Sequence, residues 1–175
     1  MDPFFIETAF ELIDFRSFSN LWFWLVLAVA WSGASYRAVG VPHDLARRAA
    51  QGEPQAMVDL RALIDVNARR MIAMADAAGP WLVGIAWFVG TLLGLMGFLY
   101  RIEFAQALLL LFVPFSLVAK LNLRTARSAM ILPDDALPNL LHRHRRIVQT
   151  MGIVSIFFTA MWGMWVNMNA TVLGP

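Results

Sequence analysis

Two long apolar segments separated by only three residues constrain this 175-residue chain more than any other feature. The first covers residues 81–100 and the second residues 104–121. An α-helix rises ~1.5 Å per residue, so each segment is long enough to cross the ~30 Å hydrocarbon core of a bilayer. One continuous helix over both would be about twice too long for a bilayer. We therefore expect a transmembrane hairpin with its tip at residues 101–103.

The bulk composition also indicates a membrane protein. Hydrophobic residues make up 59% of the sequence and charged residues 15%, whereas soluble domains carry about 25% charged residues. The sequence has no cysteine, which excludes disulfides, thiolate nucleophiles and cysteine-ligated metal centres. Its basic residues lie beside the apolar segments, as the positive-inside rule expects. We therefore predict contact with the lipid bilayer and no nucleic-acid partner.

Two further segments, 18–36 and 147–168, have the length and apolar composition of membrane spans. A different pattern precedes the first of them, because acidic residues recur there at helical spacing among apolar neighbours. This pattern predicts an amphipathic helix that lies in the membrane interface at about 3–16. Its acidic stripe consists of Glu7, Glu11 and Asp14.

The expected fold class is all-α, an integral membrane four-helix bundle that forms a single membrane domain over residues 1–175. The first polar loop, 37–80, has a seam of residues at alternating spacings of three and four from Met57 to Ala78, all apolar except Asn67, which predicts an amphipathic helix. We favour packing of this helix on the protein's own loops or on lipid headgroups over an intermolecular coiled coil. Gly79-Pro80 is expected to end the helix and to begin the second span.

The second polar loop, 122–146, is expected to contain two short amphipathic pieces divided by a turn between Pro133 and Pro138. His142 and His144 lie near its end. Residues two apart on a helix point in nearly opposite directions, so these histidines do not form a metal site together. We interpret them as part of a basic interfacial anchor.

The distribution of positive charge predicts the orientation in the membrane. Of the 14 basic residues, all except Arg16 and Arg101 fall in the two long loops or, in the case of Lys120, at the end of the span that leads into the second loop. The positive-inside rule therefore places both loops in the cytoplasm and both termini in the periplasm of a bacterial inner membrane, as a multi-pass protein.

Small and polar residues on two spans predict helix-packing faces, because small residues allow close approach of helices in a membrane. The second span carries a face of small residues at a spacing of four, and the fourth span carries a longer face of small and polar residues. We expect these two faces to pack on each other. The residues concerned are Ala86, Gly90 and Gly94 on the second span, and Gln149, Gly152, Ser155, Thr159, Gly163 and Asn167 on the fourth.

A second group of candidate residues lies on the expected periplasmic side, at the hairpin tip and in the N-terminal segment. Charged residues there either anchor the chain in the interface or contact each other or a partner subunit. They are Glu11, Asp14, Arg16, Arg101 and Glu103.

The sequence contains no P-loop, no glycine-rich dinucleotide turn and no HExxH motif. We therefore expect no enzyme activity, no cofactor and no metal. The favoured function is a non-catalytic accessory subunit of a larger inner-membrane complex, respiratory or photosynthetic, that packs against other membrane subunits. The alternatives are a small self-associating channel or transporter, and a docking or assembly factor that recruits a cytosolic partner.

Four strings in the sequence carry a family resemblance: FELIDFRSFSNLWFW at 10–24, GVPHDL at 40–45, EFAQA at 103–107, and HRHRRIVQTMGIVSIFFTAMWGMWVN at 142–167. The chain resembles a family of small proteobacterial inner-membrane proteins that are sometimes labelled components of the SufBCD iron–sulfur assembly complex. The resemblance implies that the cytoplasmic loops dock a soluble complex. It also draws attention to the N-terminal segment, the hairpin tip and the polar face of the fourth span.

Overall fold

The computed structural model of the protein describes residue 18 and residues 21–172. The expected interfacial helix at 3–16 lies outside the described residues. The described chain is all-α apart from one very short hairpin, as the sequence predicts. Its elements are α2 (Leu21–Tyr36), β1 (Arg37–Ala38), β2 (Val41–Pro42), α3 (His43–Ala50), α4 (Pro54–Gly94), the π-helix η2 (Leu95–Leu99), α5 (Glu103–Ala129), the 3₁₀ helix η3 (Asp134–Ala136) and α6 (Leu137–Val172).

Three of these helices are long and apolar enough to cross a membrane. They are α4 together with η2 (46 residues), α5 (27 residues) and α6, counted from η3 to residue 169 (36 residues). The remaining apolar helix, α2, has 16 residues. α4, η2 and α5 form the expected hairpin with its tip between residues 100 and 102.

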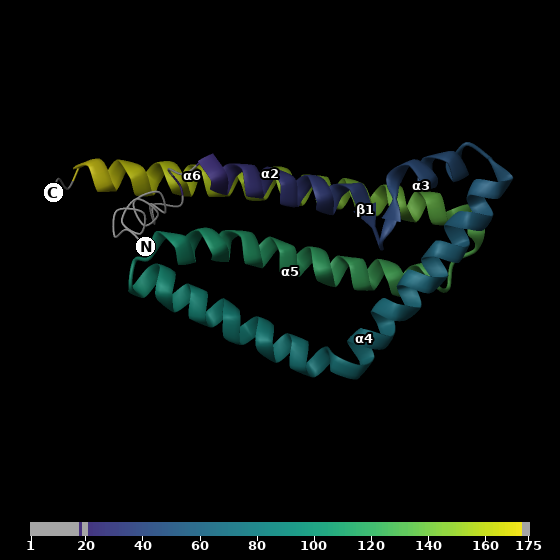
Figure 1. The fold of residues 1–175 in the computed structure, drawn as a ribbon, viewed down its shortest axis with the longest axis horizontal. Helices are drawn as coiled ribbons and strands as arrows, with labels where there is room; N and C mark the ends of the chain where they lie inside the picture. The colour runs from purple at the N-terminus through teal and green to yellow at the C-terminus, as the bar shows by residue number, and fades with distance from the viewer. Residues whose placement is uncertain (1–17, 19–20, 173–175) are drawn as a thin grey trace, which may run out of the picture.

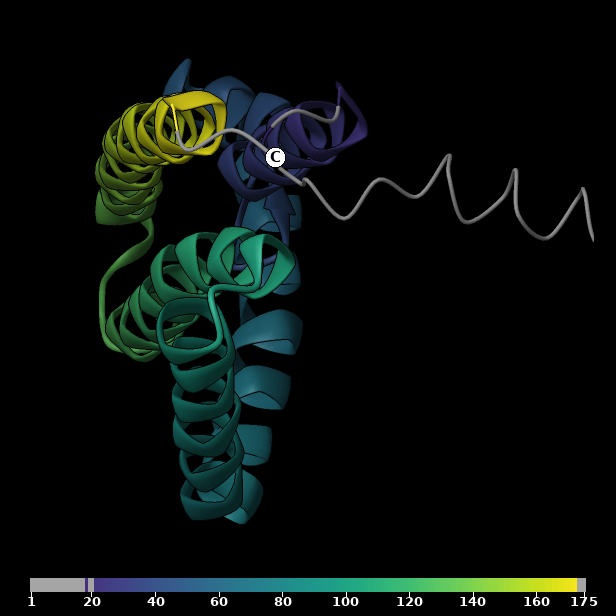
Figure 2. The ribbon, with the colours of Figure 1, turned by 90° about the vertical axis from the view of Figure 1, so that its left-hand side faces the viewer.

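The helices lie in layers. α2 and α6 run side by side, α5 lies next to this pair, and the apolar half of α4 lies on the outer side of α5 (Figures 1 and 2). The start of α2, the end of α6 and the hairpin tip gather at one end of the molecule, and α3 lies at the other (Figure 1). We call these the tip end and the polar end.

One expectation about α4 is wrong, because Gly79-Pro80 does not end the helix. α4 continues through Pro80 for 41 residues in total, and it changes direction midway along its length (Figure 1). Proline lacks an N–H and its ring clashes with the carbonyl four residues earlier, so a helix that continues through proline bends. The amphipathic loop helix and the second span are therefore one bent helix.

The second polar loop is also shorter than expected. α5 extends to Ala129 and α6 begins at Leu137, so residues 130–136 alone connect them. The helices continue past their apolar segments because their polar ends still bury apolar residues. Ala126, Ala129, Leu137 and Leu141 are all within 3% of complete burial.

The described residues form two apolar clusters, one at the polar end and one between the spans. At the polar end, the apolar seam of α4 packs on α3, α5 and α6, with Leu60, Ile64 and Leu137 fully buried. Between the spans, Leu27 and Trp31 of α2 pack against Val118 of α5 and Val148 of α6. The first cluster resembles the core of a small soluble domain, built onto the ends of the spans.

A tight turn connects α2 to this polar core. Val39 and Gly40 lie between the two strands and both have positive φ values, 53° and 73°, as a two-residue type I′ hairpin requires. Positive φ is strained for a β-branched residue. Val39 is 1% exposed, so burial in the core offsets this strain.

Candidate functional site

Gln106 is the best-connected polar side chain at the tip end. It is 7% exposed and lies in the first turns of α5. Its Nε2 donates a hydrogen bond of 2.7 Å to the carbonyl of Gly97 in η2. Its Oε1 accepts a hydrogen bond of 2.9 Å from Nε1 of Trp162 in α6. One amide therefore joins three helical elements.

Gly97 explains why the chain can close so tightly here. A Cβ atom at Gly97 would lie 3.0 Å from both the backbone nitrogen and the Cγ of Gln106, so a larger residue would push η2 away from α5. The π-helical turn points the Gly97 carbonyl at Gln106, and π-turns often occur where a helix is adapted to a specific contact.

The charged residues predicted at the hairpin tip do not pair with each other. Arg101 is exposed and has a φ of 56°, while Glu103 begins α5. Among the described residues, no ion pair joins these two side chains. The other predicted members of this group, Glu11, Asp14 and Arg16, lie outside the described residues.

The small-residue face of α6 packs on α2. A Cβ atom at Gly152 would lie 2.9 Å from the ring of Trp31, and one at Gly163 would lie 3.1 Å from Phe18. Ser155 is 9% exposed and Thr159 is 1% exposed. Asn167 is half-buried, whereas Gln149 is exposed and lies off this face.

The expected pairing of this face with the small residues of α4 is therefore wrong. A Cβ atom at Gly90 would lie 3.5 Å from the ring of Phe112 in α5 instead, and one at Gly94 would meet no described atom outside its own helical turn within 4 Å. Ala86 is half-buried. The physical reason is the layering, since α5 lies between α4 and the α2–α6 pair (Figure 2).

The opposite side of the apolar half of α4 carries large, uncovered aromatic residues. Trp81, Trp87 and Phe88 are 78%, 74% and 70% exposed. In the most apolar 18-residue stretch of α4 and η2, 6% of the residues are buried, compared with 22% in the corresponding stretches of α5 and α6. We call this side the outer face of α4.

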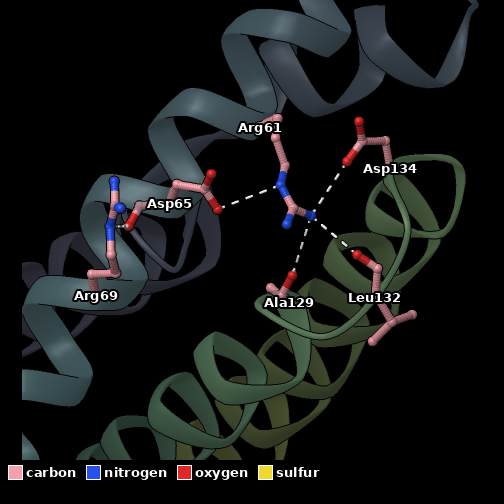
Figure 3. A network of polar contacts seen from close by, with 6 residues as sticks. All are labelled: Arg61, Asp65, Arg69, Ala129, Leu132 and Asp134. Carbon is pink, nitrogen blue, oxygen red and sulfur yellow. Dashed lines mark hydrogen bonds and ion pairs between the residues drawn. The ribbon is translucent and has the colours of Figure 1, made fainter.

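A second polar network closes the polar end (Figure 3). Arg61 of α4 donates a hydrogen bond of 3.0 Å to the carbonyl of Leu132, and the same nitrogen lies 3.5 Å from the carbonyl of Ala129. Arg61 also forms an ion pair with Asp134 through the same nitrogen, at 3.3 Å, and one with Asp65 through its Nε atom, at 3.4 Å. Arg61 therefore caps the end of α5 and fixes the α5–α6 connection to α4.

The histidines are separated as the sequence predicts. His144 is buried and its Nδ1 lies 2.9 Å from Oγ1 of Thr125 in α5. His142 lies edge-to-face against His43 of α3, with 5.6 Å between ring centroids. Among the described residues, no group of three His, Asp or Glu side chains is placed to hold a metal ion.

Searches against protein-family models, curated proteins and solved structures give no significant match to this chain. The family resemblance of the sequence therefore stays a prediction, and the site must be interpreted from its geometry.

Sequence reasoning missed two of these features. Gln106 is an amide within an apolar run. A polar group inside a membrane segment indicates a specific partner, so the sequence contained a signal for the Gln106 contacts. The role of Arg61 had no such signal, because its acceptors lie about 70 residues away in the chain.

Proposed function

We propose that this protein is a non-catalytic subunit of a larger membrane assembly, and that the outer face of α4 binds another membrane protein. The observation that carries the proposal is the exposure of this face on the apolar half of α4, which lies on the outer side of α5 (Figure 2). Tryptophan is enriched in the central contacts of protein interfaces. Two of the three exposed aromatic side chains on the outer face of α4, Trp81 and Trp87, are tryptophans.

The proposed membrane topology has four spans. α2 is an apolar helix of 16 residues and lies along α6 (Figure 1), so the bilayer that holds α6 also surrounds α2. The excess of positive charge at the polar end supports a cytoplasmic location for that end in a bacterial inner membrane, with both termini periplasmic.

The two alternative functions receive less support. A channel lined by Ser155 and Thr159 needs these side chains to face an open path, but they are buried against their own chain. A docking factor that binds through the apolar seam of α4 needs Leu60 and Ile64 to be accessible, and both have 0% exposure.

Site-specific photocrosslinking in native membranes tests the proposal. A photoreactive phenylalanine analogue replaces Trp87 on the outer face of α4, and in a matched variant it replaces Phe157 on α6, which is 60% exposed. We expect an adduct with one other membrane protein from position 87 and none with that protein from position 157. An adduct between two copies of this chain would favour self-association. Lipid adducts alone at position 87 would contradict the proposal.

A further inference from the structure

A small pocket lies where three segments of the polar end meet. Its walls come from the end of α2, the start of α3 and the polar part of α6, and they include Ser35, Tyr36, His43 and Arg145. The enclosed space is about 10 Å³, roughly room for one water molecule or one oxygen atom. This pocket is separate from the outer face of α4.

The pocket lies at the boundary between apolar and polar parts of two helices. The apolar run of α2 ends at Tyr36 and Arg37, and the apolar run of α6 begins at Ile147, two residues after Arg145. If α2 and α6 cross the bilayer, this level is that of the lipid headgroups. Tyr36 is 50% exposed, as is typical of an aromatic residue at the interface.

Basic side chains gather around the pocket. The ring of His142 lies against that of His43. Burial, followed by the charges of Arg145, His142 and Arg47, lowers the pKa of His43, and Asp44 opposes this effect. The carboxylate of Asp44 already accepts a hydrogen bond of 3.1 Å from the Tyr36 hydroxyl. A bound anion would offset the positive charges of Arg145 and Arg47 near His43.

Two sets of hydrogen-bond donors, on Arg145 and at the start of α3, have no side-chain partner among the residues that the structure describes. The Nε atom of Arg145 is buried and has no hydrogen-bond partner among the described residues. The eight-residue helix α3 begins at His43 after Pro42, whose side chain has no capping group. The first N–H groups of a helix therefore remain as donors at this position, with the positive end of the helix dipole.

We propose that this pocket binds a phosphate group, with Arg145 as the principal ligand and His43 and Ser35 as further donors. One phosphate oxygen enters the enclosed space, and the rest of the group stays at the mouth, at the level of the membrane surface. Arginine and helix N-termini are frequent phosphate ligands. The phosphate belongs either to an anionic lipid headgroup or to a soluble compound. The proposal does not depend on a protein partner at α4.

The test uses the full-length protein in phosphatidylcholine nanodiscs at about physiological ionic strength. Thermal unfolding is followed as phosphatidylglycerol is added at a low mole fraction, and separately as inorganic phosphate is added. The variants are Arg145→Gln and the matched control Arg143→Gln. Arg143 is exposed and two residues away, so it points to the other side of α6 while the total charge change is the same.

We expect phosphatidylglycerol to raise the unfolding temperature and Arg145→Gln to weaken this binding by roughly tenfold more than Arg143→Gln, which is the size of a lost charge-assisted hydrogen bond. Stabilisation by inorganic phosphate, also lost in Arg145→Gln, would identify a soluble phosphate source. Equal effects of the two variants, or no stabilisation by either phosphate, would overturn the proposal. If Arg145→Gln does not fold, His43→Gln decides instead: unchanged phosphatidylglycerol binding in that variant refutes the site.

Discussion

Replacing Gln106 with leucine tests whether its amide holds the tip end together. Leucine has a similar size and removes both polar atoms, so Gly97 O loses its 2.7 Å donor and Trp162 Nε1 loses its 2.9 Å acceptor. Interhelical hydrogen bonds in membrane proteins contribute about 0.6 kcal/mol on average and up to about 1.7 kcal/mol. Two such bonds give about 1–3 kcal/mol, and the indole N–H of the half-buried Trp162 is left unpaired, which places the expected value in the upper half of that range.

The measurement is unfolding of the purified protein in mixed detergent micelles, followed by circular dichroism. Gln149→Leu is the matched control, because it makes the same chemical change at an exposed position of α6 and should change stability by less than about 0.5 kcal/mol. A Gln106→Leu variant as stable as the control would refute the idea that this amide joins the three elements.

Three further predictions concern the polar end and the topology. Arg61→Ala should destabilise the protein by about 1–3 kcal/mol in the same assay, because the carbonyl of Leu132 loses its donor. Arg69 is an exposed arginine that bonds within its own helix, so Arg69→Ala should have little effect. Equal effects of the two variants would show that the Arg61 contacts are not stabilising. The hydrogen bond from Arg48 lowers the pKa of Glu53 below its usual 4.5. The stability that this pair contributes is therefore present at neutral pH and is lost as the pH falls below about 4.5 through the lowered pKa. Glu53→Gln should remove that part of the acid sensitivity, and an unchanged acid unfolding profile in this variant would contradict the prediction. An alkaline phosphatase fused to the C-terminus should be active in a bacterial host, because we expect this end in the periplasm; an inactive fusion with an active cytoplasmic reporter would reverse the topology.

The apolar segments made the helical architecture predictable, because length and hydropathy are local properties. The hairpin tip followed from the charged residues Arg101 and Glu103 between two apolar segments. Each of these features depends on residues close together in the chain.

Features that depend on distant contacts were harder to predict. Pro80 was expected to stop a helix, but whether a proline stops or bends a helix depends on what holds the two halves. Here the polar half of α4 is held by its packing on α3, α5 and α6. The partner of the small-residue face on α6 was also missed, because glycine spacing shows where a helix can approach but does not show which helix it is.

The bend in α4 has a mechanical consequence. α4 is tied to α5 by the Asp76–Arg127 ion pair before the bend and by Gln106 at the hairpin tip, and the same number of residues separates the two ties along each helix. The Arg127 side chain is 56% exposed and that of Asp76 63%, so this ion pair contributes little stability, while the tip is held by the buried amide of Gln106. A load on the outer face of α4 would therefore turn the apolar half about the tip. Such a movement would be taken up at the bend, where Pro80 removes one backbone hydrogen bond of the helix.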